Sequence, residues 1–182
     1  MKKYFKNLFI ILFFTIFSAS NGLCSNLDGL FDGLKNSKNS EIAKEFENKI
    51  WDYWISDGSN EINNQKMKNG INLINQGKLK DALTLFIKLS ENEPNWAEPI
   101  NKIATIRFLI GDYYGSISDI QLTLKLEPRH FGAISGLAQI NFALGRYEDA
   151  LENIRYVEKI HPYIGIKELK SILLDHMLDK QI

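Results

Sequence analysis

Glycine recurs at a fixed interval of 34 residues in this chain, at Gly77, Gly111 and Gly145. Three further columns keep the same interval. They are the small residues Gly70, Ala104 and Ala138, the small residues Ala82, Ser116 and Ala150, and the prolines Pro94, Pro128 and Pro162. A bias in composition cannot hold four columns in phase, so the interval indicates a structural repeat.

Each period predicts a pair of helices. Glycine adopts the positive φ that ends one helix, and proline cannot continue the interior of the next. Small residues at two fixed positions let the two helix axes approach closely, and we expect Ala150 to lie where such a pair crosses. The expected pairs are 61–76 with 79–92, 96–110 with 113–126, and 131–144 with 147–160.

The spacing of these columns resembles the tetratricopeptide repeat, in which place 8 is small, place 15 is Gly, place 20 is small and place 32 is Pro. The repeats would be 63–96, 97–130 and 131–164, and the resemblance implies an all-α solenoid. The chain departs from the family at place 4, where Lys66, Ile100 and Ile134 replace the usual aromatic residue. It is also similar to small exported tetratricopeptide-repeat proteins of Gram-negative bacteria.

Segments on either side of the repeats are expected to cap the solenoid. Residues 26–60 would form an arm and a helix that starts at Ser40 and ends near Ile55. Trp51 and Trp54 share one face of that helix, and we expect them to fold it over the end of repeat 1. The alternative is that they anchor a partner protein. A last helix within 165–182 would cover the open apolar face of repeat 3.

Residues 1–25 read as a secretory signal peptide. Lys2, Lys3 and Lys6 precede the apolar run from Leu8 to Phe17, and small residues follow it. That run is about half of the roughly 20 apolar residues that span a membrane. The cut site is open, and so is the fate of Cys24, the single cysteine. The expected location is therefore the periplasm, or an amino-terminal membrane anchor if the leader stays uncleaved.

The composition contains no sign of catalysis or of a cofactor. Lys plus Arg equals Asp plus Glu, 22 each, so no bulk positive field favours nucleic acid. His130, His161 and His176 lack metal-ligand spacing, and no phosphate-binding or nucleophile motif occurs. We expect no cofactor, no metal, no small-molecule substrate and no nucleic acid, with an enzyme only as a remote third possibility.

The resemblance places the candidate site on the concave face, where first helices present places 2, 5, 9 and 12. Places 5, 9 and 12 supply the candidate groove residues, which are Met67, Ile71 and Ile74, then Asn101, Thr105 and Phe108, then Ser135, Gln139 and Phe142. Such a groove holds an extended or helical segment on apolar anchors and amides. The alternative is that Phe108 and Phe142 belong to the core between helices. Place 3, at Ala133, is expected to face outward.

Some family members clamp a terminal carboxylate with Lys, Asn or Arg at places 2 and 6. Here those places hold Asn64 with Lys68, Glu98 with Lys102, and Gly132 with Gly136. Glu98 would repel a carboxylate and the glycines supply no donor, so this clamp is not expected. Asn95 and Glu98 also have the spacing of a capping box for the helix between them.

The expected function is that of a non-catalytic adaptor or assembly factor of the bacterial cell envelope. It would hold a peptide or helix of a protein partner in the groove. The rival interpretation is a structural scaffold that assembles complexes through its outer face, because a repeat fold does not by itself imply one function.

Overall fold

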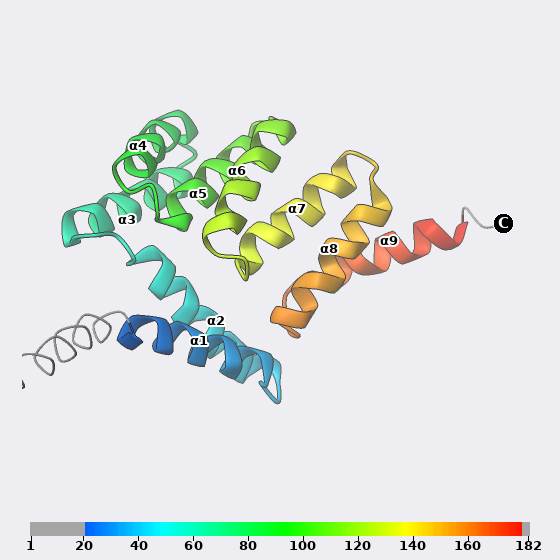
Figure 1. Cartoon of the computed structure of the whole chain (residues 1–182). Helices are drawn as coiled ribbons and strands as arrows, with labels where there is room; N and C mark the ends of the chain where they lie inside the picture. The colour runs from blue at the N-terminus through cyan, green and yellow to red at the C-terminus, as the bar shows by residue number, and fades with distance from the viewer. Residues whose placement is uncertain (1–20, 180–182) are drawn as a thin grey trace, which may run out of the picture.

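The computed structural model describes residues 21–179, and every regular element in that range is an α-helix (Figure 1). The predicted leader falls mainly on residues 1–20, outside the described residues. The helices are α1 (Asn21–Lys35), α2 (Ser40–Ile55), α3 (Glu61–Asn75), α4 (Leu79–Asn92), α5 (Ala97–Leu109), α6 (Tyr113–Leu126), α7 (Phe131–Ala143), α8 (Tyr147–Ile160) and α9 (Lys167–Asp179). The predicted all-α solenoid is confirmed.

The three repeats are the pairs α3 with α4, α5 with α6 and α7 with α8, which lie side by side (Figure 1). Gly77, Gly111 and Gly145 sit at the turns with φ of 72°, 84° and 72°. At each turn the residue after glycine donates its N–H to a carbonyl five residues back, as Lys78 does to Leu73 at 2.9 Å. This closure requires positive φ, which explains why the column is glycine.

The other small residues bring paired helices into contact. A Cβ on Gly70 would lie 2.3 Å from Phe86 Cζ, and Ala150 is fully buried between the helices of repeat 3, as predicted. Ala133 was expected to face outward, and that prediction is wrong. It is 1% exposed, because the neighbouring repeat packs over it in a cluster with Ala104 and Ile140.

Two predicted helix starts need correction. Asn39, not Ser40, caps α2, because its side-chain oxygen accepts the N–H of Ile42 at 2.9 Å. The predicted capping box of Asn95 and Glu98 is absent, since α5 starts after Trp96 with no side-chain cap hydrogen bond. Glu98 instead points into the protein and is fully buried.

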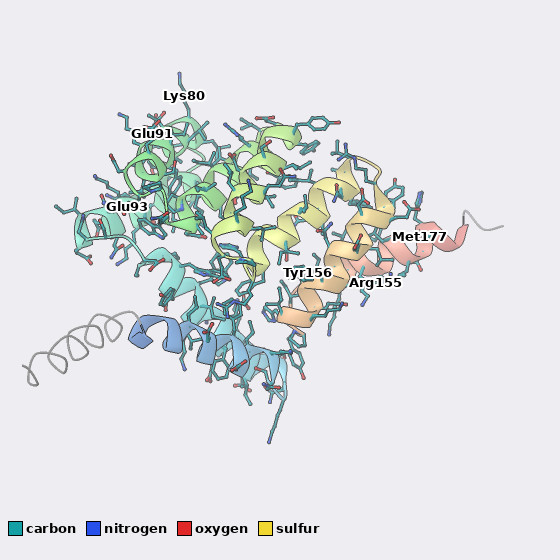
Figure 2. All side chains as sticks on the ribbon, in the orientation of Figure 1. Lys80, Glu91, Glu93, Arg155, Tyr156 and Met177 are labelled. Atoms are coloured by element: carbon teal, nitrogen blue, oxygen red, sulfur yellow. The ribbon has the colours of Figure 1, made fainter. Side chains whose placement is uncertain are left out.

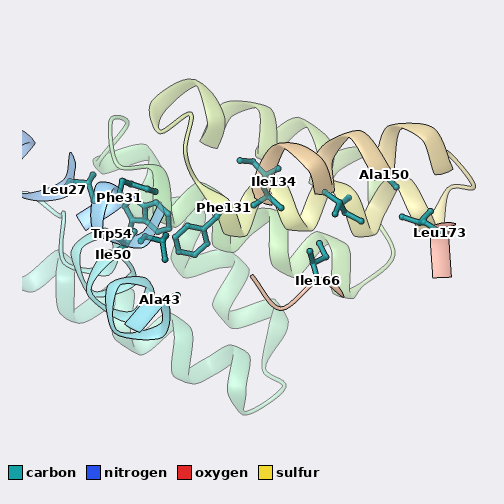
Figure 3. Close-up of a cluster of buried hydrophobic side chains, with 14 residues drawn as sticks. Leu27, Phe31, Ala43, Ile50, Trp54, Phe131, Ile134, Ala150, Ile166 and Leu173 are labelled. Atoms are coloured by element: carbon teal, nitrogen blue, oxygen red, sulfur yellow. The ribbon is translucent and has the colours of Figure 1, made fainter. Parts of the chain in front are cut away.

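Helices α1 and α2 form an antiparallel hairpin along one edge of the solenoid, where α2 contacts α3 and α5 and α1 contacts α8 (Figure 1). We had predicted that the tryptophans of α2 cover the end of repeat 1. Their rings instead pack on residues at the junction of repeats 2 and 3. Trp54 stacks on His130 with ring centroids 4.0 Å apart, and Phe31 and Trp54 surround Phe131 (Figure 3). The end of repeat 2 and the start of repeat 3 meet there, at His130 and Phe131.

Helix α9 packs at the other end of the chain. Leu173 and the preceding Ile166 are buried in the same cluster as Ala150 (Figure 3). Lys170 Nζ lies 2.7 Å from Glu158 Oε2 on α8, which ties the two helices together at the surface. Repeat 3 therefore has a neighbour on its outer side.

Candidate binding groove

A hollow of about 250 Å³ opens between α5, α6 and α7. Its walls are residues of the two first helices, and Ser116 and Ile120 of α6 close the back. The lining residues are Asn101, Ala104, Thr105, Phe108, Leu109, Ser116, Ile120, Gly132, Ala133, Gly136, Gln139 and Ile140. None of them carries a charge.

A second hollow, of about 460 Å³, lies between α5, α7 and α9. Phe108 and Gln139 line both hollows, so the two hollows adjoin, and together they are called the groove. The remaining lining residues are Phe142, Ala143, Gly165, Ile166, Glu168, Leu169 and Ile172. The groove thus follows the carboxyl halves of the first helices and reaches α9.

Five of the nine predicted groove residues meet in this groove. Asn101, Thr105, Phe108, Gln139 and Phe142 line one hollow or both. The other four do not line either hollow. Met67 is fully buried, Ile71 and Ile74 pack against the core of repeat 1, and the half-buried Ser135 donates its hydroxyl to the Phe131 carbonyl.

Phe108 and Phe142 belong both to the core and to the groove. Each half-buried ring packs on a tyrosine of its own second helix, Tyr113 or Tyr147, with centroids 5.8 Å apart in both repeats. The remaining surface of each ring faces the groove. Place 12 therefore supplies a repeated aromatic contact point on a rigid support.

The amino ends of the same first helices are occupied by the chain itself. Glu98 Oε1 lies 2.7 Å from Lys102 Nζ, and Glu98 Oε2 lies 2.9 Å from His130 Nε2. The Lys102 ammonium stands 5.0 Å from the centre of the Trp51 ring. Burial alone raises the pKa of Glu98, but the attraction of Lys102 and the bond from His130 outweigh it and lower that pKa.

The hydrogen bond that His130 accepts at Nδ1 determines which of its ring nitrogens carries the proton. Nδ1 accepts the N–H of Ala133 at 3.1 Å and so caps α7. A ring nitrogen that accepts a hydrogen bond carries no proton. The neutral ring therefore holds its proton on Nε2, and this N–H donates a hydrogen bond to Glu98 Oε2. This buried pair was missed in the sequence, although the period places residues 98 and 130 at the same end of one repeat.

These contacts also occupy Lys102, one of the donors that a carboxylate clamp would use. Lys102 is engaged by Glu98 and lies under Trp51. Trp51 covers Gly132, where a Cβ would lie 2.6 Å from the indole.

Neither a metal site nor a membrane span is visible in the described part of the chain. No group of three or more His, Cys, Asp or Glu residues in it is arranged to hold a metal ion. None of its helices is long and apolar enough to cross a bilayer.

Comparison with known proteins gives one curated relative. No protein-family model matches the chain. A TPR repeat-containing protein of Rhizobium etli is 37% identical over 119 residues, which cover 65% of this chain and 58% of the relative. The chain thus spans less than two thirds of that relative's length.

Solved structures give the same fold. The Sgt2 TPR domain of Aspergillus fumigatus has a TM-score of 0.61 at 14% identity, covering 67% of this chain and 83% of the domain. The first TPR of Spaghetti (RPAP3), bound to the HSP90 peptide SRMEEVD, has a TM-score of 0.58 at 20% identity, covering 61% and 89%. The 34-residue period, the three helix pairs and these similarities show that the chain has the tetratricopeptide-repeat fold.

Proposed function

We propose that this protein is a non-catalytic adaptor or assembly factor that holds a peptide or helix of a protein partner in the groove along α5, α7 and α9. The observation that carries the proposal is that the two hollows adjoin and share Phe108 and Gln139. Aromatic anchors beside amide groups suit an extended or helical segment. In support, a similar domain, that of Spaghetti, is described with an HSP90 peptide bound.

Pull-down experiments test which face binds. The double variant Phe108→Ala/Phe142→Ala should lose the partner that the unchanged protein captures, because both anchors of the groove are removed. The matched control is Arg155→Ala/Tyr156→Ala, whose exposed side chains lie on α8 (Figure 2). Retention by the first variant and loss by the second would contradict groove binding.

The rival function, a scaffold working through its outer face, rests on a hollow of about 470 Å³ on α7 and α8. Its lining is polar and charged: Asn141, Asp149, Glu152, Asn153, Arg155, Tyr156 and Lys159. This function predicts the reverse of the pull-down result. Crosslinking in native cells from a photoreactive residue at position 139 or at position 152 separates the two faces directly.

The cell envelope is proposed as the location, on the strength of the signal-peptide pattern alone. Replacing Lys2, Lys3 and Lys6 by Glu should block export, because the positive end of such a leader orients it. Cell fractionation measures the outcome. Normal export of the triple variant would remove this part of the proposal and leave groove binding standing.

A further inference from the structure

Gly136 forms the floor of the hollow between α5, α6 and α7, and its lack of a side chain has no structural cause. A Cβ there would meet only Ile120 Cδ1, at the ordinary contact distance of 3.6 Å. Alanine stabilises a helix interior relative to glycine. A glycine that the fold does not need, at the floor of a hollow, leaves room for a group from outside.

The size and lining of this hollow suit one apolar side chain. Its volume is about 250 Å³. Apolar walls come from Ala104, Phe108, Leu109, Ile120 and Ile140. Since no lining residue is charged, an apolar group can be buried there without removing an ionised side chain from water.

Asn101 presents a hydrogen-bond acceptor to the hollow. The residue is only 5% exposed and lines the hollow. Its Nδ2 donates to Glu98 Oε2 at 3.1 Å, and a carboxylate can only accept, so the amide cannot turn over. Its Oδ1 has no hydrogen-bond partner in the described residues and is not sealed from solvent. The Asn101 Oδ1 atom is therefore available to accept a hydrogen bond from a bound partner.

The opposite wall adds a second amide. Gln139 lines both hollows and makes no hydrogen bond within the described residues, so its donor and acceptor are both available. The nearby cation Lys102 is engaged by Glu98. A chain-terminal carboxylate would find the Asn101 oxygen and no cation among the lining residues, whereas a peptide bond would find matched partners.

We infer that the occupant of this hollow is an internal stretch of a partner polypeptide, inserted with one large apolar side chain above Gly136. The backbone N–H beside that side chain donates to Asn101 Oδ1, and a neighbouring peptide group pairs with Gln139. The inference rests on the proposed function and deepens it, since it specifies which chemistry of peptide the groove selects.

Peptide selection on the purified full chain tests the inference. Random 12-residue peptides are displayed in two libraries, one with free carboxyl ends and one within a host loop. The best binder is synthesised as the free acid, as the carboxyl amide, and with single peptide bonds replaced by esters, which removes one N–H without adding bulk. Fluorescence anisotropy measures the dissociation constants.

We expect the acid and the amide to bind equally. One ester should weaken binding about three- to tenfold, the value of one hydrogen bond. With Asn101→Ala that ester should cost nothing further. Gly136→Leu should weaken binding about tenfold or more by filling the hollow, and Gly136→Ala should weaken it less. Circular dichroism checks folding, and the ester comparison stands if Gly136→Leu does not fold.

Three outcomes overturn the inference. Binders that require a free carboxylate would do so, as would an ester penalty that persists in Asn101→Ala, or binding unaffected by Gly136→Leu in a folded protein. In each case sensitivity of the binder to Phe108→Ala/Phe142→Ala would leave the proposed function intact. Failure to select any peptide, with failure of the groove pull-down, would reject both.

Discussion

Gly132 and Gly136 lie one helical turn apart on α7 and face the same groove, but their surroundings differ. A Cβ on Gly132 would lie 2.6 Å from the Trp51 ring, whereas a Cβ on Gly136 would meet only Ile120 at 3.6 Å. The first glycine makes room for the protein's own hairpin, and the second borders open space. One face of the solenoid is thus divided into a closed amino half and an open carboxyl half.

The two halves also differ in charge. The closed half buries Glu98 with Lys102 and His130 beneath two tryptophans. The hollow of the open half that contains Gly136 has no charged lining residue. Buried charges need fixed partners, so the closed half is suited to holding the hairpin in one position. That hollow is suited to exchange a partner, because no charged side chain lining it must be uncovered when the partner leaves.

The largest expected effect is on the closed half. Trp54→Ala should lower the free energy of unfolding by about 3–5 kcal/mol, as is typical when a buried aromatic side chain leaves a cavity. Trp54 is 3% exposed and stacks on His130. Urea denaturation measures the change, and Phe108→Ala, at a half-buried ring of the open half, should cost less. Equal losses would mean that the two halves are equally rigid.

A substitution behind the groove should loosen the open half. Ala150→Leu overpacks the crossing of α7 and α8 and should cost about 1–3 kcal/mol. Each repeat contacts only its neighbours. The exchange of backbone amide hydrogens should therefore become faster in repeat 3 and α9, while the amides of α3 and α4 stay protected. Glu152→Leu, exposed on the same helix, is the control. Loss of protection throughout the chain would contradict independent behaviour of the repeats.

The contact between the hairpin and repeat 3 should weaken in mild acid, because His161 after α8 lies 3.4 Å from Glu47 of α2. Burial lowers the pKa of His161, and the partner Glu47 offsets only part of that effect. As pH falls through the usual histidine value, the unfolded chain takes up a proton that the folded chain excludes, so stability is lost. One group changes the unfolding free energy by at most about 1.4 kcal/mol per pH unit. His161→Asn should reduce the slope between pH 7 and 5, and an unchanged slope would exclude His161 as its source.

The smallest effect separates the two glycines themselves. Gly136→Ala should stabilise the protein by up to about 1 kcal/mol, since alanine is the better helix residue and its methyl group fits. Gly132→Ala should destabilise it, because the Trp51 ring must move. Thermal unfolding of the two variants side by side measures both signs. The same sign for both would mean that the division of the groove at Gly132 and Gly136 is wrong.

The helix bounds could be predicted from the sequence where the same local signals recur in each repeat. The bounds of α4, α6 and α8 are as expected, because glycine and proline mark helix ends through backbone geometry alone. The places of Phe108, Gln139 and Phe142 in the repeat put all three beside the hollow between α5, α7 and α9, and their part in binding stays a prediction. Prediction from sequence failed for Met67 and Ala133, since neither residue type reveals which face a neighbouring helix will cover.

The sequence alone determined the period, the helix pairs and the face on which a groove can form, because these depend on residues close along the chain. Only the tertiary structure decided which half of that face stays open. Arg129 meets Asp28 across 101 residues, and Trp96 Nε1 donates to the Trp54 carbonyl across 42. Such contacts follow no period, because they join residues far apart in the chain, and the place where the hairpin packs depends on the assembled shape of the repeats.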